Sequence, residues 1–244
     1  MVCAAFCGFL AAFHLAAEQP PTNAPPAETA FDPTSAYREQ QIEGWRVLVN
    51  TNLLADRELG ERTLKLLDLQ LHQITRAVPA EALAKLRQIP IWVERSSRQF
   101  RCMCYHEAEG WLRTHGVNPE KTGAVELANP EVFLEWAREQ PWMVLHELAH
   151  GYHQRFLGHG HADIRECFEK AKDTKSYESV LRINGRRERH YALNNHKEYF
   201  AEATEAFFGT NDFYPFVRAE LKEHDLEMYK VLCEVWGVAP KAVH

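Results

Sequence analysis

Hydrophobic and polar positions repeat with two different periods along this chain, which separates a part with strands from a part with helices. Residues 45–50 (WRVLVN) alternate and are rich in β-branched side chains, as is typical of a strand. The same reasoning predicts further strands over 89–94 and 123–129, and apolar residues at helical spacing predict a helix over 59–78. Between the last two strands we expect a loop carrying Cys102, Cys104, Tyr105 and His106.

From residue 130 onward the pattern becomes helical. Pro130 and Pro141 each stand where a first helical turn can begin, and Gly158 and Gly160 follow the second helix as end signals. The predicted helices cover 131–139, 141–157, 162–172, 195–208 and 215–235, with a basic loop over 182–190. Because strands come first and helices follow, the sequence predicts an α+β fold.

The N-terminal sequence predicts a targeting segment followed by a disordered linker. Residues 1–17 are apolar but shorter than the roughly 20 residues that span a bilayer, so we predict a signal peptide, although no Lys or Arg precedes it. Residues 18–36 are rich in proline and predict a disordered linker. We therefore expect one domain over 37–244, secreted or periplasmic, monomeric and without stable membrane insertion.

Composition and charge narrow the class of protein. The chain has 244 residues, of which 45% are hydrophobic and 25% charged, as suits one globular domain. A net charge of -6 argues against a nucleic-acid partner, which a basic face would bind. Two alternatives stay open for the cysteines beyond the signal segment, either two disulfides or free buried thiols. Those cysteines are Cys102, Cys104, Cys167 and Cys233.

The predicted helix over 141–157 contains the sequence His-Glu-Leu-Ala-His. His146 and His150 are four residues apart, so both imidazoles can face one metal ion from one side of a helix. Glu147 then lies close enough to take a proton from a water without being a ligand. A catalytic zinc site needs a third protein ligand. The best candidates lie on one side of the predicted helix over 195–208, at Glu198, Glu202 and Glu205.

Two other patterns for a third ligand fit less well. The metzincin pattern requires Gly and His where this chain has His153 and Phe156, so that class is excluded. The segment GTNDFY resembles the Gly-Thr-x-x-Asp element of aspzincins, but its Asp212 is one position too close to the Gly-Thr pair. A turn before Pro215 explains Asp212 better.

These residues together resemble the gluzincin metallopeptidases, in particular the catalytic domain of anthrax toxin lethal factor. HELAH is followed here by the segment Glu198-Tyr199-Phe200-Ala201-Glu202-Ala203, similar to the second helix of that domain. The resemblance covers about residues 140–210 and implies a zincin-like fold, with a small mixed sheet, an active-site helix and a mostly helical C-terminal half.

The resemblance also implies a role for each residue. One zinc ion per chain is held by His146, His150 and Glu198, while Glu202 orients a ligating imidazole. Glu147 is the general base, and Tyr191, seven residues before Glu198, assists catalysis. The implied activity is zinc-dependent hydrolysis of peptide bonds in a peptide or protein. Two alternatives remain, an inactive binding module with the same fold and a zinc hydrolase of a non-peptide amide.

The remaining features bear on the substrate. The predicted strand over 123–129 can be an edge of the sheet to which an extended peptide adds as a further strand. Alternatively, it is an ordinary edge strand that the charge of Glu126 protects from pairing with another chain. Arginines in the basic loop favour acidic substrates or are simply solvated. They are Arg182, Arg186, Arg187 and Arg189. We interpret the histidines that follow HELAH, His153, His159 and His161, as surface or supporting groups rather than a further metal site.

Overall fold

The computed structural model describes residues 31–238, so the predicted signal peptide and residues 18–30 of the predicted linker lie outside the described residues. Residues 31–36 contact the domain, since Asn50 Nδ2 donates to Asp32 and Thr34 Oγ1 donates to Glu120. The elements of the N-terminal part are η1 (Thr34–Ala36), β1 (Tyr37–Ile42), β2 (Trp45–Asn50), α1 (Thr51–Ala55), α2 (Arg57–Ala77), α3 (Ala80–Leu86), β3 (Ile91–Val93), β4 (Met103–Tyr105), α4 (Glu109–Thr114), η2 (Pro119–Lys121), β5 (Val125–Leu127) and α5 (Pro130–Trp136).

The C-terminal part is helical apart from a short hairpin. Its elements are α6 (Met143–Tyr152), the π-helical turn η3 (His153–Leu157), α7 (Ala162–Thr174), β6 (Val180–Leu181), β7 (Arg187–Glu188), η4 (Tyr191–Asn194), α8 (His196–Phe208), α9 (Arg218–His224) and α10 (Leu226–Val235). In the range 31–238 no helix combines the length and the hydropathy of a membrane span.

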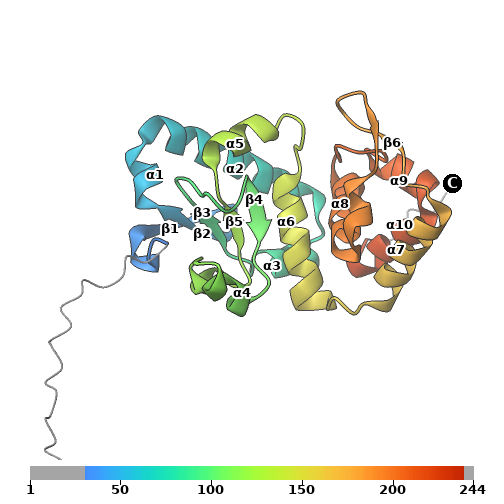
Figure 1. Cartoon of the computed structure of the whole chain (residues 1–244), viewed down its shortest axis with the longest axis horizontal. Helices are drawn as coiled ribbons and strands as arrows, with labels where there is room; N and C mark the ends of the chain where they lie inside the picture. The colour runs from blue at the N-terminus through green and yellow to red at the C-terminus, as the bar shows by residue number, and fades with distance from the viewer. Residues whose placement is uncertain (1–30, 239–244) are drawn as a thin grey trace, which may run out of the picture.

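Five strands form a mixed sheet in the order β1-β2-β3-β5-β4 (Figure 1). β2, β3 and β5 run parallel to one another, whereas β1 pairs antiparallel with β2 and β4 antiparallel with β5. The strands expected over 45–50, 89–94 and 123–129 are confirmed as β2, β3 and β5. The sheet followed by helices confirms the α+β class with a small mixed sheet.

The expectation that residues 123–129 form the edge of the sheet is wrong. β4 pairs with β5 along its length, with Met103 opposite Leu127 and Tyr105 opposite Val125, so β4 is the edge strand. The segment expected to be a loop is therefore partly a strand. β3 and β5 are equally short, but their residues are buried and each contains a β-branched valine. The residues of β4 are only partly buried and none is β-branched, which is why the hydrophobic pattern does not predict it.

The two faces of the sheet differ because side chains alternate along each strand. Val47 and Val49 of β2 point into the main core, which includes the buried side chains of α2 and α6. Leu48 and Trp92 point to the opposite face, where they form a smaller cluster with Tyr37. Helices α2, α3, α5 and α6 thus pack on one face of the sheet.

Most of the predicted helices are present, with one division. The expected helix over 215–235 is two helices, α9 and α10, that meet at Asp225. Asp225 has a non-helical backbone and accepts a hydrogen bond from Met228 N through Oδ1, which caps α10. Its other oxygen accepts hydrogen bonds from the hydroxyl groups of Tyr177 and Tyr199. A carboxylate that serves both as a helix cap and as a buried acceptor explains the break.

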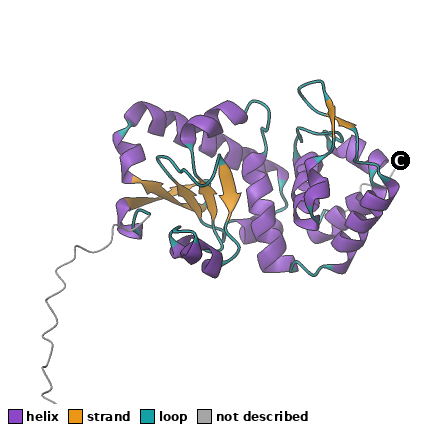
Figure 2. Ribbon diagram, in the orientation of Figure 1, coloured by secondary structure: helices purple, strands orange, loops and turns teal. Residues whose placement is uncertain are grey.

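Helix α6 stands between the sheet and the C-terminal helices. Figure 2 shows the five strands on one side of α6 and α7 to α10 on the other, with α6 and α8 side by side.

The four cysteines in the described residues are free thiols, which supports the second of the two cysteine alternatives. Three of them are buried, and burial raises the pKa of Cys102 and of Cys167 to about 12.

One glycine fixes how closely the ends of α6 and α8 approach. A Cβ atom at Gly209, the C-cap of α8, would lie 1.9 Å from Cε2 of Trp142, the N-cap of α6. We expect Gly209→Ala to destabilise the protein by about 1–3 kcal/mol, the usual cost of overpacking. Gly110→Ala is the control, because Gly110 lies in α4 with open space at its Cβ and alanine favours a helix. Equal melting temperatures for the two variants in thermal unfolding would contradict this account.

Candidate metal centre

Helix α6 forms because its apolar side chains can be buried on two sides. Val144 and Leu148 are fully buried, and Gly151 lets the helix approach the sheet, since a Cβ there would lie 2.7 Å from Ile89 and 2.9 Å from Tyr105. The one side left for polar groups carries His146 and His150. Their ring centroids are 4.8 Å apart and nearly perpendicular, so both rings stand on the same face one turn apart.

Helix α8 supplies the third donor. Asn195 caps its first turn by accepting hydrogen bonds from the backbone N–H groups of Lys197 and Glu198. Because α8 begins directly after Asn195, Glu198 lies in its first turn, opposite α6. Oε2 of Glu198 is 3.1 Å from Nε2 of His146 and 3.3 Å from Nε2 of His150. The predicted trio is thus brought together, and one donor atom from each lies within 4.8 Å of the other two.

The donor set fits a zinc ion. Two imidazole nitrogens and one carboxylate oxygen are typical ligands of a catalytic zinc, which leaves a fourth position for water or substrate. Burial acts to raise the pKa of Glu198, but hydrogen bonds from His146 and His150 outweigh it and hold that pKa well below its usual value. Glu198 therefore stays a carboxylate, the form that binds a cation.

The supporting contact to the first histidine comes from a different glutamate than expected. Nδ1 of His146 donates a hydrogen bond to Glu205 Oε1 at 2.7 Å, while Glu202 Oε1 is 3.8 Å away. Glu205 lies seven residues after Glu198, so it shares the helix face, and α8 crosses α6 where this turn meets the imidazole. The contact expected from Glu202 is therefore made by Glu205. A neutral His146 ring that donates through Nδ1 has an unprotonated Nε2, which can bind a metal in place of its contact with Glu198.

Burial raises the pKa of both of these acidic residues. Glu202 is buried and close to Glu205, and both effects raise the pKa of Glu202 well above its usual value. Its protonated form is thus favoured, which relieves repulsion along the row of carboxylates on α8. Glu202 also anchors the chain after α8, because Asn211 Nδ2 donates to its backbone oxygen.

This pair of buried glutamates gives a direct test of which one supports the site. We expect Glu205→Gln to weaken zinc binding by about 10- to 100-fold, the usual effect of losing a partner of a ligating histidine. Glu202→Gln is the matched control, since Glu202 Oε1 is 3.8 Å from His146 Nδ1 and makes no hydrogen bond to that ring. Zinc affinity is measured by competition with a chromogenic chelator. Equal losses in both variants would show that the two carboxyl groups support the site together.

A cavity of about 670 Å³ opens in front of the three donors. Glu147 and Tyr191 both line it, with Tyr191 on η4 and 48% exposed at its mouth. Burial and the charge of Glu198 raise the pKa of Tyr191, so its hydroxyl stays protonated and can donate a hydrogen bond. The edge strand β4 also lines the cavity through Met103, Cys104 and Tyr105.

The acidic and basic residues around the cavity largely pair with each other. Asp212, the weaker candidate for a third ligand, is buried with its Oδ2 3.1 Å from Arg182 Nε. Its surroundings are those of an ion pair, and it does not belong to the donor group of the histidines.

Arg182 also approaches Glu188, and Arg189 donates to Asn194. The basic loop is partly a hairpin, β6 with β7, whose arginines bind neighbouring groups.

Comparison with known proteins gives one structural likeness. No family model matches the chain, and no curated protein matches it. A solved structure of the PRO-PRO endopeptidase PPEP-2 from Paenibacillus alvei is similar, at 18% sequence identity and a TM-score of 0.44, over 80% of this chain and 99% of that one. A likeness of this extent leaves the function to be argued from the residues of the site.

Proposed function

We propose that this protein is a zinc-dependent endopeptidase of the gluzincin type. The observation that carries the proposal is the convergence of His146, His150 and Glu198 beside Glu147 at the wall of one cavity. Three donors for a metal and a carboxylate that is not among them are what metal-assisted hydrolysis requires. A general base has no use in a protein that only binds, which argues against the alternative of an inactive module.

The residues divide the chemistry among them. A bound zinc ion supplies Lewis acidity, which polarises a carbonyl group and lowers the pKa of water. Glu147 accepts a proton from the attacking water and later returns it to the leaving amine. Tyr191 donates a hydrogen bond to the oxygen on which negative charge develops. Glu205 holds the His146 ring in place throughout.

The edge strand supports a peptide as substrate. β4 is the last strand of the sheet, it lines the cavity, and an extended peptide can add to such an edge through main-chain hydrogen bonds. We therefore propose that a peptide adds to β4 rather than to β5, which is one of the two alternatives from the sequence. With the N-terminal segment read as a signal peptide, we propose a secreted or periplasmic monomer that acts on peptides or proteins.

The test is cleavage of a peptide library by the full chain, followed by mass spectrometry. We expect internal cleavage that stops when a chelator removes the metal and returns when zinc is restored. Zinc binding with no cleavage of any peptide would overturn the endopeptidase proposal and favour the binding module. Hydrolysis confined to small non-peptide amides would overturn it in favour of the other alternative.

A further inference from the structure

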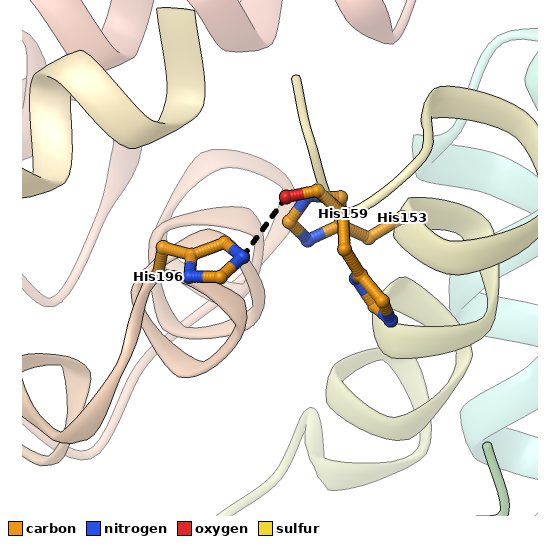
Figure 3. Close-up of side chains that lie close together, drawn as sticks. All are labelled: His153, His159 and His196. Carbon is orange, nitrogen blue, oxygen red and sulfur yellow. Dashed lines mark hydrogen bonds between the residues drawn. The ribbon is translucent and has the colours of Figure 1, made fainter. Parts of the chain in front are cut away.

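A second group of possible metal donors lies one turn beyond the first. His153 begins the π-helical turn η3, His159 stands in the loop that follows it, and His196 is the first residue of α8 (Figure 3). One ring nitrogen from each lies within 4.8 Å of the other two. None of these residues belongs to the site of His146, His150 and Glu198, although both groups bridge the same two segments of the chain.

His153 is the central member and is unusual for a buried histidine. Its side chain is 0% exposed, yet within the described part of the chain neither ring nitrogen has a hydrogen-bond partner. Buried polar groups almost always have such partners, and a histidine that merely fills the core is no exception. Burial lowers the pKa of His153 to about 3, so the ring is neutral and keeps a free electron pair. Of the two interpretations of His153 from the sequence, the surface group is therefore wrong, whereas a supporting group is consistent with its burial.

The two other histidines complete the group. Figure 3 shows the rings of His159 and His196 on either side of His153, with centroids 5.0 Å and 5.8 Å from its own. His196 Nε2 donates a hydrogen bond to the backbone oxygen of His159 at 3.1 Å, which ties the loop to α8. Among the described residues, both ring nitrogens of His159 also lack hydrogen bonds.

A carboxylate that is paired with a lysine lies next to this group. Glu107 Oε1 is 3.4 Å from His159 Nε2, and both oxygens of Glu107 bind Lys197 Nζ at 2.8 Å. Three neutral imidazoles with a carboxylate at their side suit a divalent ion that prefers nitrogen, such as zinc. Zinc–nitrogen bonds of about 2.0–2.1 Å require ligand nitrogens closer together than those here, which small rotations of the two outer rings can provide.

We propose that His153, His159 and His196 form a second zinc site, separate from the catalytic one and structural in role. The ion holds the loop around His159 and the first turn of α8 against η3. Because Glu198 lies on that same turn of α8, the site also fixes the position of the third catalytic ligand. The proposal does not depend on the proposed function, since it concerns binding by other residues.

The test is zinc stoichiometry of the full chain, first freed of metal and then titrated with zinc. We expect two bound ions in wild type, one in Glu198→Ala, one in His159→Ala and none at comparable affinity in the double variant. His159 is partly exposed, so its replacement leaves the core intact, which circular dichroism checks. His72→Ala is the control, because His72 lies on α2 and contacts Glu43, and it should bind as wild type does.

A second measurement uses thermal unfolding and cobalt. In the Glu198→Ala background, zinc should raise the melting temperature, and cobalt(II) should give visible d–d bands; adding His159→Ala should remove both. The inference is overturned if His159→Ala binds as many ions as wild type, or if Glu198→Ala binds none. One ion in wild type that Glu198→Ala keeps and His159→Ala loses would support this site and refute the catalytic one.

Discussion

Replacing Glu147 with glutamine should reduce peptide hydrolysis by about 10²- to 10⁴-fold while zinc stays bound, as expected when a general base is removed. Glu147 follows His146 on α6 and lines the cavity, but it is not among the donors that converge with Glu198. Glutamine has the same shape and cannot accept the proton of the attacking water. The change therefore removes one chemical step and leaves the metal ligands in place.

The measurement pairs kcat with zinc content for wild type and Glu147→Gln. Glu188→Gln is the matched control, because Glu188 also lines the cavity and is partly exposed, and it contacts Arg182. We expect less than a several-fold change for this control. Full turnover by Glu147→Gln with zinc bound would show that another group accepts the proton. Loss of zinc from this variant would instead show that Glu147 contributes to the metal site.

The proposed ligand trio is predicted from sequence, the two histidines through helical spacing and Glu198 through the resemblance to gluzincins. His146 and His150 share a face through helical spacing alone, and the segment from Glu198 to Ala203 identifies the second helix. What sequence cannot fix is where two helices cross. Glu202 and Glu205 both lie on the side of α8 that faces α6, and only the packing of the two helices places Glu205 on His146. The wrong choice between them therefore follows from tertiary structure.

The sheet shows the same division between local and tertiary information. β2 has six residues, two of which are the β-branched Val47 and Val49, so its pattern is visible in the sequence. β4 has three residues, and its identity as a strand depends on pairing with β5. β1 is also missed because much of it is polar and exposed at the other edge of the sheet. As a result, the strand that borders the cavity became known only from the structure.

His153 illustrates a third kind of error. A histidine seven residues after the first proposed ligand and outside the HELAH pattern is interpreted as a surface or supporting group, because most histidines are at least partly exposed. In the structure His153 begins the π-helical turn η3, and its ring packs against the ring of Phe200, with 4.9 Å between the two ring centroids. Burial of this ring depends on the approach of α8, which no spacing in the sequence reports.

Replacing Glu198 with alanine should cause the largest loss of zinc from the catalytic site. Its Oε2 is the only carboxylate oxygen in the donor trio and approaches both histidines, at 3.1 Å and 3.3 Å. Removing it leaves two neutral nitrogens, so the loss of affinity should exceed the about 10- to 100-fold that follows loss of a supporting residue. Glu198→Gln keeps an oxygen without its charge, and we expect an affinity between those of wild type and Glu198→Ala.

This series is best measured in a His159→Ala background, where only the catalytic site contributes to zinc binding. Glu147→Gln should keep zinc and lose turnover, whereas Glu198→Ala should lose both, because one residue acts on the proton and the other on the metal. Excess zinc should restore part of the activity of Glu198→Gln, since its defect is one of affinity, and none of the activity of Glu147→Gln. Full zinc affinity in Glu198→Ala would place the third ligand elsewhere in the cavity wall.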